Sequence, residues 1–184
     1  MPHELAKARV LVVDDHYSNR LALETLLESE YAVDTAGSGQ SALKLASNHA
    51  YAVILLDVRM PEMDGFETAA LLRENPKVHD TAIIFTSAYD QSDAKVAKGF
   101  QAGATDYLLS PIDTDFLKLK MRTYVRMFLR IQALRIHIER ITNILQSLQL
   151  EVSRSGNVEE ALRTQVSELE EVVREMRREM VPTV

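Results

Sequence analysis

A run of four apolar residues that stops at a carboxylate is the feature that most constrains how this chain folds. Residues 53–56 are Val, Ile, Leu and Leu, and Asp57 follows them directly. A short apolar run bounded by polar residues is typical of a strand buried on both faces of a parallel sheet. Turn residues follow between positions 60 and 65. We therefore expect Asp57 at the carboxyl end of a central strand, the edge where open α/β sheets bind ligands.

The chain as far as residue 111 alternates between strand and helix patterns with short connections. Strands are predicted at 9–13, 31–36, 52–56, 82–86 and 105–109, the second of them at an edge of the sheet. Helices are predicted at about 18–27, around 42–46, at 66–74 and at 90–101, the first capped by Ser18 or Asn19. This alternation predicts an α/β fold with right-handed crossovers and a parallel sheet covered by helices on both faces.

A second acidic cluster occupies the same topological position as Asp57. Asp14 and Asp15 close the apolar run at 10–13. Because the carboxyl ends of parallel strands meet at one edge of a sheet, these carboxylates are expected beside Asp57. Mg²⁺ is a hard cation that prefers such oxygen ligands. The sequence therefore predicts a magnesium site at this edge.

Four segments carry a resemblance to a known family. They lie at 11–15, 56–65, 83–88 and 103–108. In order and spacing they resemble the response regulator receiver domain, the CheY-like family of two-component signalling, over roughly the first two-thirds of the chain. The resemblance implies a flavodoxin-like, doubly wound, five-stranded parallel sheet. We assign the receiver domain to residues 1–112.

The resemblance also implies a chemistry. Asp57 matches the phosphoacceptor of the family, which takes a phosphoryl group from a histidine kinase, so the chain is expected to be a regulatory protein and not an enzyme. The implied Mg²⁺ ligands are Asp14, Asp15, Asp57 and the backbone carbonyl of Arg59. A cation is needed there because the attacking carboxylate and the phosphoryl oxygens are all negatively charged.

Two further positions match the residues that respond to phosphorylation in the family. Ser87 matches the hydroxyl that binds the phosphoryl oxygens, and strand alternation directs the neighbouring Thr86 elsewhere. Tyr107 matches the aromatic residue that changes rotamer; simple packing is the alternative for its ring. Arg59 and Tyr89 lie two residues beyond Asp57 and Ser87, where the family tunes dephosphorylation.

Ser110 departs from the family pattern. The family has a Lys before the Pro that follows the fifth strand, whereas Ser110 precedes Pro111 here. A Lys supplies a point charge to the phosphoryl oxygens, and a Ser supplies only a neutral hydroxyl. The alternative function is therefore a pseudo-receiver scaffold that acts by protein–protein binding. The resemblance also implies a cis peptide bond between these two residues.

After the receiver pattern the sequence predicts a long helix. Residues 113–155 contain neither Gly nor Pro, and their apolar residues recur four and three positions apart, with a stammer near Ile131. The predicted dimer seam comprises Met121, Tyr124, Phe128, Ile131, Leu134, Ile138, Ile141, Leu145, Leu148 and Val152. A helix over 114–154 would be about 60 Å long and needs a partner helix to cover its apolar seam.

The helical coiled-coil tail, residues 113–184, is expected to break near 155–157. Gly156 suits a helix C-cap and Asn157 an N-cap, which favours a helical hairpin. The apolar residues from Leu162 onward stay in phase with the first seam, which favours one continuous coiled coil. Both alternatives stay open, and both predict a homodimer, as a parallel coil or as a four-helix bundle.

Polar residues of the tail are expected in solvent. A basic ridge recurs every four residues, and it is expected to be solvated, with contact to an acidic surface as the alternative. The ridge consists of Lys118, Arg122, Arg126 and Arg130. His137 is expected at the surface of the coiled coil.

Composition excludes several classes of protein. The absence of Cys excludes disulfides and thiolate metal sites and fits a reducing compartment. The net charge of −6 argues against a nucleic-acid surface, so no direct DNA binding is expected. No signal peptide or membrane-spanning run is recognisable, and we expect a cytoplasmic protein with an unknown downstream partner. A second alternative is that the chain is the N-terminal part of a larger receiver-coupled enzyme.

Overall fold

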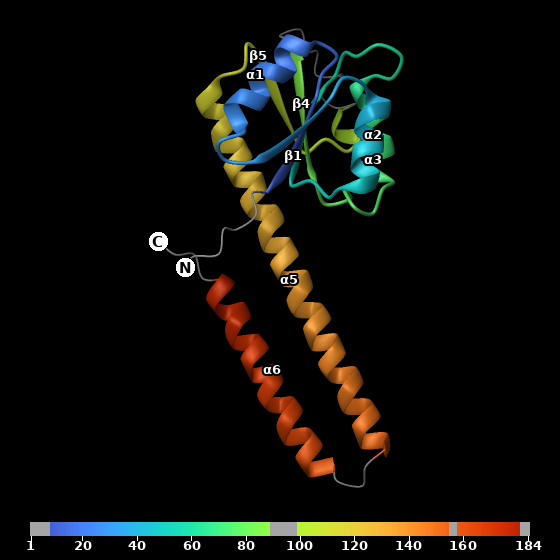
Figure 1. Cartoon of the computed structure of the whole chain (residues 1–184), viewed down its shortest axis with the longest axis vertical. Helices are drawn as coiled ribbons and strands as arrows, with labels where there is room; N and C mark the ends of the chain where they lie inside the picture. The colour runs from blue at the N-terminus through green and yellow to red at the C-terminus, as the bar shows by residue number, and fades with distance from the viewer. Residues whose placement is uncertain (1–7, 89–98, 155–157, 181–184) are drawn as a thin grey trace. The chain divides into compact units, whose positions relative to one another are not determined.

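A five-stranded parallel sheet forms the centre of the first part of the chain (Figure 1). The computed structural model describes residues 8–88, 99–154 and 158–180. The strands are, in chain order, β1 (Arg9–Val13), β2 (Ala32–Ala36), β3 (Val53–Asp57), β4 (Ala82–Ala88) and β5 (Asp106–Ser110). In the sheet they lie in the order β2-β1-β3-β4-β5. The helices are α1 (Tyr17–Leu27), α2 (Gly39–Asn48), α3 (Gly65–Arg73), α5 (Thr114–Arg154) and α6 (Val158–Met180). This flavodoxin-like order confirms the predicted fold class, with β3 at the centre and β2 at an edge.

The helix predicted at 90–101 lies mostly outside the described residues. Its last three residues, 99–101, are described, and they are helical. None of the helices in the described part of the chain combines the length and the apolarity that a membrane span requires.

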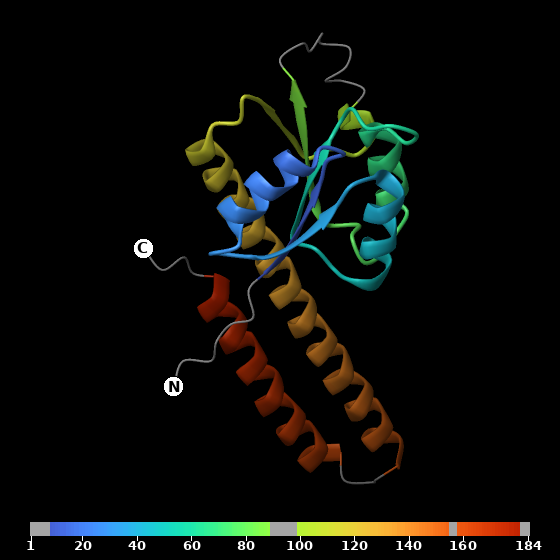
Figure 2. The same cartoon turned by 45° about the horizontal axis from the view of Figure 1, so that its top comes forward.

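Each face of the sheet carries its own apolar core, and β3 contributes to both. Ile54 packs on the side of α2 and α3, together with Leu72. Leu55 points to the opposite side, where it shares a core with Leu27 of α1 and Leu117 of α5. Figures 1 and 2 show these helix pairs on opposite faces of the sheet. The four apolar residues of β3 are fully buried, which confirms the expected double burial.

The chain turns tightly between β3 and α3. The Asp64 carboxylate caps α3 by accepting a hydrogen bond from the Glu67 backbone N–H at 2.8 Å. A Cβ atom at Gly65 would collide with the backbone carbonyl oxygen of Asp57. Only a glycine therefore permits α3 to begin so close to the end of β3, and this close approach places the loop over the carboxyl edge of the sheet.

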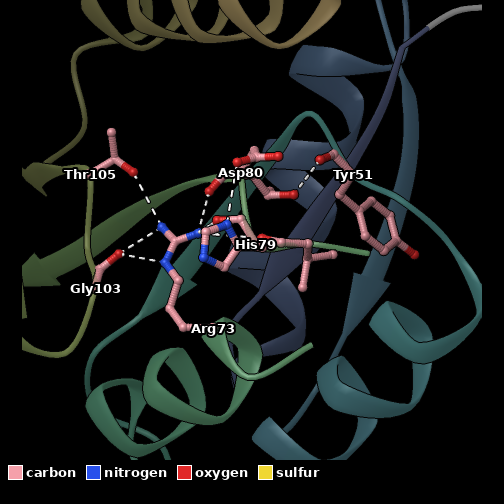
Figure 3. A network of polar contacts seen from close by, with 8 residues as sticks. Tyr51, Arg73, His79, Asp80, Gly103 and Thr105 are labelled. Atoms are coloured by element: carbon pink, nitrogen blue, oxygen red, sulfur yellow. Dashed lines mark hydrogen bonds and ion pairs between the residues drawn. The ribbon is translucent and has the colours of Figure 1, made fainter. Parts of the chain in front are cut away.

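The Arg73 side chain fastens the segments that lead into β4 and β5 (Figure 3). Its guanidinium donates hydrogen bonds to the backbone carbonyls of Gly103, at 2.6 and 3.0 Å, His79, at 2.9 Å, and Thr81, at 2.7 Å. Burial lowers the pKa of Arg73 from its ordinary value. Gly103 has a φ of 98°, a conformation that favours glycine. The Arg73 network therefore holds the turn from which β5 starts.

The first turns of α5 belong to the core of the sheet. The chain divides into two compact units, Met1–Phe128 and Leu129–Val184. Met121, which the heptad spacing assigned to a dimer seam, is fully buried in the core beneath the sheet, so it is not available to another chain. Tyr124 and Phe128 pack against the same core. The seam prediction is therefore corrected at its N-terminal end.

Within the second unit, α5 and α6 form an antiparallel hairpin. The Ser147 hydroxyl hydrogen-bonds to the Gln165 side-chain oxygen at 3.1 Å, and Arg140 pairs with Glu175. Because the contacts pair earlier residues of α5 with later residues of α6, the two helices run in opposite directions (Figures 1 and 2). Of the two alternatives for the tail, the antiparallel contacts correspond to the helical hairpin and not to one continuous coiled coil. The predicted break at 155–157 lies outside the described residues.

Two polar residues of α5 bear on the expectations for the tail. Arg122 is exposed, as expected of the ridge, and its guanidinium also pairs with the Glu30 carboxylate through hydrogen bonds of 3.1 and 3.2 Å, which is the contact with an acidic surface named as the alternative. The expectation for His137 is wrong. His137 is buried and not at a surface. Helical periodicity locates the faces of a helix, but it does not reveal which neighbouring element covers each face.

Replacement of Arg73 tests the importance of its network. We expect Arg73→Ala to lower the free energy of unfolding by about 3 kcal/mol, because several backbone carbonyls, most of them partly buried, lose a charged donor. Arg73→Lys keeps the charge but not the planar set of donors, and it should recover only part of the loss. Urea unfolding followed by circular dichroism measures both, with the exposed Arg126→Ala as control. An Arg73→Ala variant as stable as this control would contradict the assignment.

Candidate functional site

A cavity of about 560 Å³ lies at the carboxyl edge of the sheet. Four of the predicted positions lie in its wall: Asp14, Asp57, Arg59 and Ser110. The other described lining residues are His16, Asn19, Ala22, Leu23, Leu26, Thr86, Pro111 and Ile112. The strands end here side by side, as the sequence predicted, so the acidic and hydroxyl groups of distant segments meet in one place.

Asp14 is held by the first turn of α1. One of its carboxylate oxygens accepts a hydrogen bond from the His16 backbone N–H at 2.7 Å, and the other accepts one from the Asn19 side-chain amide at 3.0 Å. Asn19 therefore orients the carboxylate and does not cap the helix as expected; the helix begins at Tyr17 without a side-chain cap. The Arg20 guanidinium holds the same turn through the backbone carbonyl of Asp14 at 2.6 Å. Sequence patterns did not reveal this role of Arg20.

Three potential ligand side chains cluster in this turn. The ligand atoms of Asp14, Asp15 and His16 lie within 4.8 Å of one another. The His16 ring nitrogen Nδ1 lies 2.8 Å from an Asp15 oxygen. Carboxylate oxygens are hard donors that suit Mg²⁺, whereas an imidazole suits softer metals, so Asp14 and Asp15 are the residues of this turn that could hold Mg²⁺.

The electrostatics of Asp57 indicate a place for a cation. Burial is the main cause that raises the pKa of Asp57, and the charges of Asp14 and Asp15 raise it further. The backbone N–H of Arg59 opposes this rise. Negative charges that are partly buried beside one another repel, and a bound divalent cation would relieve that repulsion. The donor set of the site therefore fits Mg²⁺.

The two candidate hydroxyls at the end of β4 lie on opposite faces of the sheet. Thr86 is paired in register with Asp57 and lines the cavity. Ser87 alternates with it and shares the face of Phe85, against which Tyr107 packs. Thr86 is thus part of the cavity wall, and Ser87 lies on the face that carries Tyr107. Tyr89 lies outside the described residues.

Tyr107 is enclosed by aromatic rings. Its ring centroid lies 5.4 Å from that of Phe85 and 5.3 Å from that of Phe100. Its hydroxyl occupies the space that a Cβ atom would take at Gly99. Burial raises the pKa of Tyr107. The absence of a side chain at Gly99 therefore allows the tyrosine to lie inward.

Ser110 and Arg59 share the wall of the cavity, and the peptide bond between Ser110 and Pro111 is cis, as expected. No Lys lines the cavity among the described residues, and Arg59 is the one Arg there. Among the described residues, the lining of the cavity thus lacks the ammonium group that the family places beside the phosphoacceptor, and Arg59 is its one basic residue other than His16.

A network that sequence reasoning missed connects β5 with α5. One Asp106 carboxylate oxygen accepts a hydrogen bond from the backbone N–H of Tyr107 at 2.8 Å. The other accepts one from the Tyr124 hydroxyl at 2.9 Å and also binds the Lys120 ammonium. Burial by itself would raise the pKa of Asp106, but the hydrogen bonds from Lys120, Tyr107 and Tyr124 outweigh it and lower the pKa. One carboxylate thus joins the backbone at Tyr107 to α5.

Comparison with known proteins agrees with this geometry. The family model described as response regulator receiver domain matches residues 10–122, more than half of the chain. Response regulator PleD of Caulobacter vibrioides is 39% identical over 129 residues, which are 70% of this chain and 28% of PleD. The chain therefore spans only about a quarter of the length of that relative.

Solved structures show the same fold. Chemotaxis protein CheY4 of Vibrio cholerae is 33% identical, with a TM-score of 0.61 over 65% of this chain and 99% of that chain. The receiver domain of sensor histidine kinase PA1611 from Pseudomonas aeruginosa PAO1 is 27% identical, with a TM-score of 0.60 over 65% of this chain and 98% of that chain. That structure has a magnesium ion coordinated in its active site cleft.

The charge on Asp57 should destabilise the protein when no cation is bound. We expect Asp57→Asn to raise the free energy of unfolding by on the order of 1 kcal/mol at neutral pH without Mg²⁺. Because the pKa of Asp57 is raised in the folded state, its protonation stabilises the fold, and this stability is lost as the pH rises through the raised pKa. The difference in free energy of unfolding between Asp57→Asn and the wild type should therefore shrink as the pH falls through that pKa.

Asp34→Asn is a matched control for the sign of this effect. Burial would raise the pKa of Asp34, but the hydrogen bonds from Tyr51 and Arg9 outweigh it and lower the pKa. Neutralising Asp34 should therefore destabilise the protein at neutral pH. Thermal unfolding in buffer with EDTA measures both variants. An Asp57→Asn variant that is less stable than the wild type would contradict the repulsion argument.

Proposed function

Because this chain belongs to the response regulator receiver family, we propose that it accepts a phosphoryl group on Asp57 from a partner histidine kinase, with Mg²⁺ as cofactor. The observation that carries this proposal is the cavity in which Asp57, with a raised pKa, shares the wall with the buried Asp14. Receiver domains are regulatory phosphoacceptors and not enzymes, so the proposed product is a signalling state of this protein.

The residues of the site have separate roles in this reaction. A carboxylate oxygen of Asp57 attacks the phosphorus, forming a P–O bond while the P–N bond to the kinase imidazole breaks. Mg²⁺, held by Asp14, Asp15, Asp57 and the Arg59 carbonyl, would neutralise the charges of the carboxylate and of the phosphoryl oxygens. The hydrogen bonds from His16 and Asn19 would hold the Asp14 carboxylate in the orientation in which it binds Mg²⁺.

Arg59 is proposed to supply part of the positive charge that Ser110 lacks. Arg59 is one of the residues that line the cavity, together with Asp57 and Ser110. A guanidinium stays charged at every physiological pH and binds phosphoryl oxygens well. Arg59 is also proposed to tune dephosphorylation, together with Tyr89, because both lie two residues beyond site residues.

Asp106 is proposed as the connection from the site to the tail. Ser87 would follow the phosphoryl group, and Tyr107 on the same face would adjust its ring. The Asp106 carboxylate binds the backbone of Tyr107 and two side chains of α5, so a movement of β5 would reach α5 through it. In this proposal the tail forms a homodimer and passes the signal to a downstream protein.

Ser110 supports a second candidate function, a pseudo-receiver scaffold. A site without the family Lys can retain its fold and its partner surfaces while phosphoryl transfer is slow or absent. In that case the tail would act through binding alone.

Phosphoryl acceptance can be measured directly. After incubation with acetyl phosphate and Mg²⁺, the intact mass should increase by one phosphoryl group, because Asp57 is the nucleophile. Asp57→Asn should show no increase, and EDTA should abolish the increase in the wild type. No increase in a folded wild-type protein would favour the scaffold.

The same assay tests the role of Arg59. Arg59→Ala should slow phosphorylation about tenfold, because the phosphoryl oxygens lose a charged partner. Ser110→Lys should speed the reaction, because the new ammonium group adds positive charge beside the phosphoryl oxygens. It should also make the reaction less sensitive to the Arg59 substitution, since Lys and Arg59 would then neutralise the same oxygens. Equal sensitivity to Arg59→Ala in both backgrounds would contradict this role.

A further inference from the structure

The hairpin of the second unit uses only one side of each of its helices for internal packing. On α6 this side carries Gln165 and Val172, which are buried. On α5 it carries the buried His137 and, one heptad and a turn later, Ser147, which contacts Gln165. These residues define the line along which the two helices touch.

The main apolar rows of both helices lie outside this contact line. On α5, Leu134, Ile138 and Leu145 are 36%, 58% and 52% exposed. On α6, Leu162, Val166 and Val173 are 42%, 50% and 42% exposed. Both rows have the spacing of a coiled-coil seam, yet the hairpin does not cover them.

Both rows fall on the same side of the hairpin. Ile138 follows His137 of the contact line by one residue, and Val166 and Val173 likewise follow Gln165 and Val172. One residue turns a helix by about 100°. Because the helices run in opposite directions, equal steps from the contact line bring both rows to the same face. We call the face that carries these six apolar residues the seam face.

The size of the seam face is compatible with an interaction site. Two adjacent helices, each about 14 residues long, present a face on the order of 400 Å². This area is in the range of the largest apolar patches on monomeric proteins, which are often interaction sites. On α6 the face forms a groove of about 400 Å³, lined by Val166, Leu169 and Val173 and bordered by Glu170, Arg174 and Arg177.

The chemistry of this face matches a second copy of the chain. The apolar rows of α5 and α6 have similar lengths and spacings, so a copy related by a two-fold axis can lay its own rows across them. The border of the groove carries both signs of charge, and Glu170 of one copy can therefore meet Arg174 or Arg177 of the other. A border of one sign would repel an identical copy.

We propose that the seam face pairs with the seam face of a second copy, so that two hairpins form a four-helix bundle. This pairing deepens the proposed role of the tail and rests on it, but it does not depend on phosphorylation. It excludes Met121, which is buried in the core of the sheet, and it adds α6 to the dimer contact. Packing of this kind covers both apolar rows at once.

Two isoleucines of α5 provide a matched test. Ile136 and Ile138 are both 58% exposed, but they flank His137 on opposite faces of the hairpin. The full chain has a mass of 20.8 kDa, so the wild type should sediment at about twice this mass in analytical ultracentrifugation. Ile138→Glu should raise the dimer dissociation constant about 100-fold, because it places a charge in an apolar interface. Ile136→Glu should leave the dimer intact.

Milder variants and a separate readout keep the test decisive. Ile138→Ala should weaken the dimer about tenfold, and Ile136→Ala should not weaken it. Because the Ala variants introduce no charge, they avoid any loss of folding that the Glu variants cause. Mg²⁺-dependent phosphorylation of Ile138→Glu should be unchanged, so failure of the dimer proposal is distinguishable from failure of the proposed function. A monomeric wild type, which would assign the face to a different protein, would overturn the proposal. Equal weakening by the two Glu variants would overturn it as well.

Discussion

Burial of β3 on both of its faces is the constraint on which the rest of the structure depends. Each apolar residue of β3 belongs to one of two cores, so a shift of the strand by one residue would move every one of them into the opposite core and disrupt the packing of both. This register fixes the place where the apolar run ends, and Asp57 stands at that point. Helix α3 then begins in direct contact with the end of the strand, which requires Gly65. The position of the proposed phosphoacceptor is thus a consequence of packing.

The same packing places negative charges close together at the proposed phosphorylation site. The ends of β1 and β3 lie side by side, and the carboxylates of Asp14 and Asp57 meet at one cavity. Burial and mutual repulsion raise the pKa of Asp57, so the site favours any ligand that brings positive charge. In our proposal Mg²⁺ supplies most of that charge, and Arg59 supplies part of what the family obtains from a Lys. Under this proposal, the departure at Ser110 changes how the charge is supplied and leaves the acidic centre intact.

Much of the fold was predictable because it rests on local patterns. The apolar runs gave the strands, and the carboxylates that end them located the cavity at one edge of the sheet. The error at Met121 has a different origin: over a few turns, the spacing of a coiled-coil seam is the same as that of a helix lying on a sheet. The hydrogen bonds of Arg73 and Asp106 were not predictable, because their partners lie up to 32 residues away in sequence. Such contacts have no periodic signal.

In the proposed function, Asp57 and a divalent cation together form an acyl-phosphate site. Beryllofluoride mimics a phosphoryl group on a carboxylate, and fluorine NMR detects its bound form directly. We predict a bound signal in the wild type that requires both beryllofluoride and Mg²⁺ and that is absent in Asp57→Asn. Amide signals of Asp106 and Tyr107 should shift at the same time, because the proposed connection to α5 passes through them. A folded wild-type protein that shows no bound fluoride signal in the presence of Mg²⁺ would contradict the account.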